Sequence, residues 1–213
     1  MQLLIAISAF IWLVMAESPT DKEREEIVEF HTCIHETVNP PASNMQLMHY
    51  SLELENLAKQ AAELRCAGSG VDPSVHTQFQ GCGIIANSDN RENKSIVDNL
   101  NAIYELEKPA YSYDTNMCTG YCLDSKTMMR SQTTAVGCTT EACQDGKGVF
   151  TVCIYKLGEF DPQDRPYEKG QSCSKCHNGF ACYRNQFKEP STTVPTTSSA
   201  TIASAFRSCL LLC

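Results

Sequence analysis

Positive charge is scarce in this chain. Its 213 residues hold 17 Lys and Arg against 25 Asp and Glu, so the formal net charge is -8, and no basic run is longer than two residues. Proteins that bind the phosphate backbone of nucleic acids need clustered Lys and Arg. The charge balance therefore excludes a nucleic-acid partner.

Charged side chains are missing altogether from residues 1–16, MQLLIAISAFIWLVMA. This apolar stretch ends at the small Ala16 and is followed by the polar Glu17 and Ser18. A secretory signal peptide has this form, whereas the alternative, an uncleaved anchor helix, needs about 20 apolar residues to span a bilayer. We therefore expect residues 1–16 to be removed on export, together with Trp12, the only tryptophan of the chain.

Cysteine, in contrast, is abundant, with 13 in the chain. In an exported chain this number predicts disulfide bonds, and because it is odd, at least one thiol is free or bonded to another molecule. The run Cys173-x-x-Cys176-His177, followed by Cys182, looks like a zinc knuckle. Thiols are usually oxidised in an oxidising compartment, so we expect disulfides here, and neither a metal nor a cofactor.

The spacing of apolar residues predicts helices first and strands later. Intervals of three and four residues indicate helices over residues 20–37, 51–65 and 94–107. β-branched and aromatic residues indicate strands over residues 132–139 and 149–157, separated by turn-forming residues. Helices followed by strands without strict alternation favour an α+β fold with an antiparallel sheet.

The C-terminal part of the chain differs in composition. Residues 161–189 form a Pro-, Gly- and Cys-rich module, whose fold would come from disulfides and not from a core, and the main domain covers residues 17–160. Residues 190–213 form a tail that begins with a Ser/Thr/Pro stalk, of the kind that is disordered and can carry O-linked sugars. The tail ends in apolar residues, so it is either a GPI-attachment signal or a plain disordered tail. A membrane contact is expected only through such a C-terminal anchor.

Several runs of residues resemble the CAP superfamily (SCP/TAPS). His31, residues 38–45 (VNPPASNM) and residues 50–58 (YSLELENLA) are similar to the opening helix, loop and second helix of CAP domains, and look most like venom-allergen-like proteins of parasitic worms. Residues 152–155 (VCIY) are similar to the second family signature, Val-Cys-Asn-Tyr. Residues 166–176 (PYEKGQSCSKC) look like the cysteine-rich hinge that follows many CAP domains.

The resemblance implies a three-layer α-β-α sandwich followed by a small cysteine-rich module. It also implies disulfide bonds, by analogy with plant pathogenesis-related members of the family. These bonds would join Cys66 to Cys143, Cys118 to Cys122, and Cys138 to Cys153. Cys33 and Cys82 are then left over in the domain, and a bond between them is the remaining option.

CAP domains typically hold two His and two Glu in a central cleft, where the histidines can bind a divalent metal. The resemblance places the first His at His76. The first Glu falls at residues 82–84 (CGI), where no register supplies a carboxylate. The second Glu is Glu107 if the alignment is anchored on Tyr111, whereas anchoring on Tyr104 selects Leu106 instead, and the second His becomes Asp124. The tetrad is therefore eroded, and no catalytic residue is predicted.

The family's sterol and lipid binding is linked to an aromatic-rich loop after the third helix. In this chain the loop carries four side chains that could make an apolar lip with polar edges, namely Tyr111, Tyr113, Met117 and Tyr121. The alternative is that they only pack the loop onto the core. A fatty-acid groove between helices is a further alternative, which nothing in the sequence localises.

One N-glycosylation sequon is present, at Asn93. Together these features predict a secreted, non-catalytic glycoprotein of the CAP type that binds a sterol or fatty acid, or proteins of a host. Two alternatives remain open. One is an interaction protein tethered to the cell surface by its C-terminal tail, and the other is a CAP protein that keeps a residual divalent-metal site.

Overall fold

The fold is built on a four-stranded sheet in the order β1-β5-β6-β2. The computed structural model describes residues 18–89, 94–144, 148–157, 163–176 and 178–190. The sheet strands are β1 (His49–Tyr50), β2 (Cys82–Asp89), β5 (Ala135–Ala142) and β6 (Val149–Lys156). The three long strands are antiparallel, while the short β1 runs parallel to β5. The predicted signal peptide, the sequon Asn93 and nearly all of the C-terminal tail lie outside the described residues.

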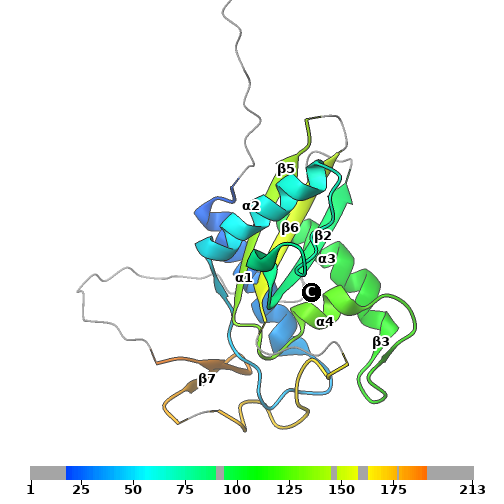
Figure 1. Cartoon of the computed structure of the whole chain (residues 1–213). Helices are drawn as coiled ribbons and strands as arrows, with labels where there is room; N and C mark the ends of the chain where they lie inside the picture. The colour runs from blue at the N-terminus through cyan, green and yellow to red at the C-terminus, as the bar shows by residue number, and fades with distance from the viewer. Residues whose placement is uncertain (1–17, 90–93, 145–147, 158–162, 177, 191–213) are drawn as a thin grey trace, which may run out of the picture.

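Helices cover both faces of the sheet (Figure 1). The helix α2 (Leu52–Cys66) lies on one face, and the helices α1 (Asp21–Thr37), α3 (Ile96–Glu107) and α4 (Leu123–Met128) lie on the other. The side chains of β6 alternate between the two layers, as the period of a strand requires: Cys153 and Tyr155 join the core with α1 and α3, whereas Val152 and Ile154 join the core with α2. The predicted three-layer α-β-α sandwich is confirmed. In the described part of the chain, no helix is both long and apolar enough to cross a bilayer.

The first helix carries two fully buried histidines among its apolar residues. His31 Nδ1 lies 2.7 Å from the carbonyl oxygen of Ile27, and its Nε2 lies 3.1 Å from the hydroxyl of Tyr155. A neutral ring with its proton on Nδ1 satisfies both contacts, since it donates to the carbonyl and accepts from the hydroxyl. Burial lowers the pKa of His31 to about 4. His31 is therefore a neutral core residue that joins α1 to β6.

Four disulfide bonds lie within the described residues. Three of them are the pairs that the family resemblance implies: Cys66–Cys143, Cys118–Cys122 and Cys138–Cys153. The fourth, Cys173–Cys182, lies in the C-terminal module and takes up two of the thiols that looked like zinc ligands.

The expected bond between Cys33 and Cys82 is wrong. Cys33 is already in a disulfide bond, whereas Cys82 is a free thiol. The reason lies in the layers, because Cys33 is buried in α1 while Cys82 packs with the α2 core on the opposite face of the sheet. Cys176 is a second free thiol among the described residues.

Short elements complete the chain between α2 and α4. The 3₁₀ turns are η1 (Thr77–Phe79) and η2 (Lys108–Ala110), and a small two-stranded sheet pairs β3 (Tyr111–Ser112) with β4 (Met117–Cys118). Of the residues that the sequence assigned to the aromatic loop, Tyr111 lies in β3 and Met117 in β4.

The cysteine-rich module is held against α1 by polar contacts as well as by its disulfide. Its hairpin pairs β7 (Ala181–Tyr183) with β8 (Gln186–Lys188), and Arg184 at the turn forms ion pairs of 2.8 Å with Glu29 and Glu36 of α1. The buried Gln186 donates from Nε2 to the carbonyl oxygen of Thr32, at 3.1 Å. The expectation that disulfides alone shape this module is therefore incomplete.

Replacing Arg184 with Met should loosen this hairpin from α1. The variant keeps the aliphatic length but loses two ion pairs that are only partly exposed, together worth about 1–2 kcal/mol. We expect amide hydrogen exchange of residues 181–188 to become roughly tenfold faster, while the central sheet is unchanged. Lys188→Met is the matched control, since Lys188 only lies over the Tyr183 ring. Unchanged exchange in Arg184→Met would show that the disulfide alone holds the module.

Candidate functional site

Glu107 and Asp124 lie together where the end of α3 meets the start of α4. Glu107 Oε2 accepts a hydrogen bond from the backbone N of Ser125, at 2.9 Å. Burial, reinforced by the nearby charge of Asp124, raises the pKa of Glu107 against the opposing effect of that hydrogen bond. Burial also raises the pKa of Asp124, whose Oδ1 accepts from the Tyr121 hydroxyl at 3.2 Å. The alternative alignment would have selected Leu106, but that side chain is 79% exposed.

His76 lies apart from this pair. It precedes η1, its ring meets the edge of Phe79 at 6.3 Å between centroids, and it lines a shallow pocket with residues of α2. Phe79 belongs to the α2 core, whereas α3 and α4 lie on the other face of the sheet. Among the residues that the structure describes, no three His, Cys, Asp or Glu side chains gather closely enough to hold a metal ion.

Gly83, one of the three positions where the resemblance places the first Glu, faces apolar groups. A Cβ added to Gly83 at the start of β2 would lie 3.0 Å from both Leu157 Cδ1 and Thr127 Cγ2. A larger side chain there would require these two side chains to move. Ser125, next to Asp124, is fully buried, and its hydroxyl donates to the carbonyl oxygen of Cys122 at 3.0 Å. This hydroxyl is therefore engaged with the backbone and is not a free nucleophile beside Glu107 and Asp124.

The aromatic loop divides into an inward half and an outward half. Tyr111 and Tyr113 are partly buried against the α1 and α3 core, and Tyr113 stacks on Tyr167 with centroids 4.8 Å apart. Met117 and Tyr121 are 66% and 63% exposed. Packing onto the core, one of the two alternatives from the sequence, therefore describes Tyr111 and Tyr113 but not the exposed Met117 and Tyr121.

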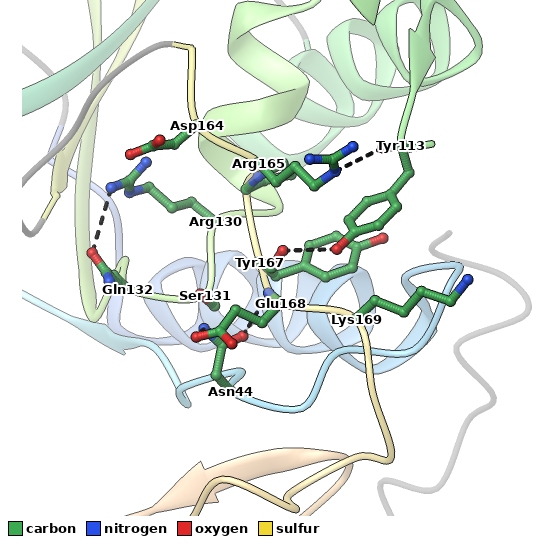
Figure 2. A pocket seen from close by; sticks show the side chains of 11 residues that line it. Asn44, Tyr113, Arg130, Ser131, Gln132, Asp164, Arg165, Tyr167, Glu168 and Lys169 are labelled. Atoms are coloured by element: carbon green, nitrogen blue, oxygen red, sulfur yellow. Dashed lines mark hydrogen bonds between the residues drawn. The ribbon is translucent and has the colours of Figure 1, made fainter. Parts of the chain in front are cut away.

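A polar pocket of about 840 Å³ lies beside this loop (Figure 2). Four segments that are distant in the sequence line it: Asn44 after α1, Tyr113 of the loop, residues 130–132 after α4, and residues 164–169. This pocket could not be predicted from the sequence, because its residues come from separate runs of the chain and share no periodicity. Only the fold brings them together.

Comparisons with known proteins agree with these observations. The model of the CAP family, described as the cysteine-rich secretory protein family, matches residues 19–155. Mouse peptidase inhibitor 16 is 27% identical over 180 residues, covering 80% of this chain and 34% of the relative. The human protein of that name is 25% identical over 200 residues, covering 88% of this chain and 42% of the relative. The chain thus spans about a third to two-fifths of the length of these curated relatives.

Solved structures show the same fold. The venom allergen-like protein 4 of Schistosoma mansoni superposes with a TM-score of 0.56 and 28% identity, covering 74% of this chain and 100% of that one. A crystal structure of NaASP2 with Zn²⁺ superposes with a TM-score of 0.55 and 23% identity, covering 76% of this chain and 95% of that one. The second likeness, at its lower identity, speaks for the fold alone.

Proposed function

This chain belongs to the CAP family of cysteine-rich secretory proteins, and we propose that it is an extracellular binding protein, not an enzyme, whose ligand is a sterol or another lipid. The observation that carries the proposal is the outward half of the aromatic loop. Seven large hydrophobic side chains are exposed among the described residues, and four of them fall between residues 106 and 123: Leu106, Met117, Tyr121 and Leu123.

The loop is held in place mainly by contacts of other residues. Tyr111 donates a hydrogen bond to Asn116 Oδ1 at 2.9 Å, and the Tyr113 hydroxyl donates to the carbonyl oxygen of Tyr167 at 3.0 Å. The bond Cys118–Cys122 closes the segment between Met117 and α4. A surface that is already ordered loses little conformational entropy when it binds, so the exposed side chains are free to contact a ligand.

The polar groups at this surface suit a sterol. A sterol is apolar except for one hydroxyl, which needs a hydrogen-bond partner when it is buried. The Tyr121 hydroxyl and the Asp124 carboxylate lie 3.2 Å apart at the edge of the exposed apolar side chains. Contact with Met117 and Tyr121 would bury the sterol rings, and these two polar groups would meet its hydroxyl.

The geometry favours this function over the residual metal site. A metal-dependent CAP protein would need His76 beside Asp124, and His76 lies with α2 instead. Binding of host proteins uses the same kind of exposed surface and becomes the alternative if lipids fail to bind. A C-terminal tether rests on the apolar tail, which lies outside the described residues, so it stays a prediction from the sequence.

The test is saturable binding of radiolabelled cholesterol, with palmitate as a second probe, by the oxidised chain without its first 16 residues. A double variant, Met117→Ser with Tyr121→Ser, should weaken binding at least tenfold, since each lost apolar contact is worth about 1 kcal/mol or more. Val75→Ser is the matched control, because Val75 is 70% exposed but lies outside the loop. Circular dichroism verifies that each variant is folded.

Two results would count against the proposal. The first is a folded wild-type protein that binds neither probe saturably. The second is a double variant that binds as tightly as Val75→Ser, which would place the ligand elsewhere on the protein.

A further inference from the structure

The pocket of Figure 2 is too polar for a lipid. Eleven residues line it, and only Pro166 and the two tyrosines, Tyr113 and Tyr167, contribute large apolar surfaces. A lipid chain placed here would take the polar side chains out of water without giving them partners, and each such group costs free energy. The pocket therefore needs a ligand that makes hydrogen bonds, unlike the surface at Met117 and Tyr121.

The charges of the pocket nearly balance. Arg130, Arg165 and Lys169 bring positive charge, and Asp164 and Glu168 bring negative charge. Figure 2 shows Asp164 beside the guanidinium of Arg130. Burial lowers the pKa of Arg130, and the charge of Asp164 opposes this effect. A simple anion bound at Arg130 would also meet Asp164, and a cation bound at Asp164 would also meet Arg130. Neither kind of ion is selected at this pair, and the charge of Glu168 is already met by Lys175.

The hydrogen-bonding groups are mixed in the same way. The amides of Asn44 and Gln132 carry both donors and an acceptor, the arginines only donate, and the carboxylates only accept. Each amide oxygen already accepts one hydrogen bond, from Glu168 N at 2.9 Å and from Arg130 Nη2 at 3.4 Å, and keeps a second lone pair for a ligand. A hydroxyl group donates one hydrogen bond and accepts up to two. A ligand that carries several neighbouring hydroxyl groups can therefore use every type of group in the pocket.

The walls are fixed to one another before any ligand arrives. Arg165 donates from Nε to the carbonyl oxygen of Tyr113 at 3.0 Å and from Nη2 to that of Asp114 at 2.7 Å. Glu168 N donates to Asn44 Oδ1 at 2.9 Å, and Ser131 N donates to the carbonyl oxygen of Pro166 at 2.8 Å. Preorganised polar groups bind a polar ligand at a lower cost in entropy.

We propose that this pocket is a binding site for a neutral saccharide, such as the end of a glycan on another protein or cell surface. Its volume of about 840 Å³ lies within the roughly 300–1,000 Å³ of small-molecule sites, which is room for more than one sugar ring. The site is separate from the proposed lipid surface, so the protein would carry two kinds of ligand contact on neighbouring faces of the same loop.

The experiment is a glycan array that presents neutral glycans ending in mannose, galactose or N-acetylglucosamine beside sulfated glycans, followed by calorimetric titration with the best neutral glycan. Gln132→Ala and Asp164→Asn change exposed side chains of the pocket, and each should weaken binding about three- to tenfold, the worth of one or two hydrogen bonds. Glu53→Gln on the exposed side of α2 is the matched control and should bind as the wild type does.

The salt dependence of binding distinguishes the proposed neutral ligand from an anionic one. Binding of a neutral glycan should change little between about 50 and 300 mM sodium chloride, because screening acts on charge pairs. The proposal is overturned if no neutral glycan binds the folded chain, if only sulfated glycans bind and salt removes them, or if both pocket variants bind like the control. The Met117→Ser, Tyr121→Ser variant should keep glycan binding, so failure of one proposal does not imply failure of the other.

Discussion

Lowering the pH from about 7.5 to about 5 should reduce the free energy of unfolding by about 2 kcal/mol through His31 alone. This histidine is fully buried, and burial lowers its pKa to about 4. Its two ring nitrogens are satisfied in the neutral form, by the Ile27 carbonyl and the Tyr155 hydroxyl. A proton on Nε2 would break the hydrogen bond from Tyr155 and place a charge in the core.

The sign follows from the two pKa values. In the unfolded chain a histidine has a pKa of about 6.5, and in the folded protein the pKa of His31 is about 4. Between these values the unfolded state binds a proton that the folded state does not bind. Stability is therefore complete above about pH 6.5 and falls as the pH drops toward 4.

His35 should contribute to the same pH dependence, because burial lowers its pKa to about 4 as well. Both of its ring nitrogens face carbonyl oxygens, those of Gln46 and Met128, each at 3.0 Å. A carbonyl only accepts, so a neutral ring satisfies one of these contacts and a protonated ring satisfies both. These acceptors oppose the effect of burial without outweighing it. We choose His31 for the test because its neutral ring satisfies both of its contacts, so its hydrogen bonds as well as its burial favour the neutral form.

The measurement is urea unfolding of His31→Gln at about pH 7.5 and pH 5. The variant is expected to be less stable than the wild type at pH 7.5, but to lose about 2 kcal/mol less on acidification. His49→Gln is the control, because His49 is exposed on β1 and should leave the wild-type pH dependence intact. If His31→Gln and His49→Gln lose the same free energy between the two pH values, His31 does not control the transition.

The regular elements with strong apolar patterns could be predicted from the sequence. The helix expected over residues 51–65 is α2 (Leu52–Cys66), and the strand expected over residues 149–157 is β6 (Val149–Lys156). The strand expected over residues 132–139 begins three residues later, at Ala135, because residues 130–132 turn toward the polar pocket.

Among the elements that were not predicted, β2 and α4 show the reason, because tertiary contacts specify both. The strand β2 (Cys82–Asp89) contains Gly, Asn and Ser, and its form comes from eight paired positions with β6. The helix α4 has six residues, too few to show a period. A hydrogen bond from Ser125 N to the Glu107 carboxylate supports its first turn. Neither contact can be inferred from local sequence.

The candidate site was predicted only in part for the same reason. The family resemblance selected Glu107 and Asp124, which the fold brings together, but it also selected His76, which the fold leaves with α2. The saccharide pocket has no sequence signal, since its four segments meet only in the folded chain. Exposure likewise separates Met117 and Tyr121 from Tyr111 and Tyr113, although all four share one short loop.

Gly137→Ala should destabilise the protein by about 3 kcal/mol, the upper part of the range for an overpacked core. Gly137 lies in β5 beneath the first turn of α2. A Cβ at this position would lie 2.2 Å from Glu55 N and 2.5 Å from both the Leu54 carbonyl carbon and the Ser51 oxygen. All three are backbone atoms, so no side-chain rotation relieves the overlap. The start of α2 must move away from the sheet.

That movement would also disturb a buried charge. Glu55 is 3% exposed, and its carboxylate accepts from Arg24 Nε at 3.0 Å and from the Tyr50 hydroxyl at 2.9 Å. Arg24 belongs to α1, so the contact joins the two helix layers across the edge of the sheet at β1. A buried carboxylate that loses these partners is costly, and its displacement adds to the steric cost of the methyl group.

Gly83→Ala is the matched control for the same measurement, urea unfolding at neutral pH. Gly83 also lies in a strand, but the atoms that an added Cβ would meet, at 3.0 Å, belong to the side chains of Leu157 and Thr127. Side chains can rotate, so we expect a loss of about 1 kcal/mol or less. The decisive result is which of the two variants loses more free energy of unfolding. If Gly83→Ala were the more destabilised, the close approach of α2 to β5 at Gly137 would not be what makes glycine necessary there.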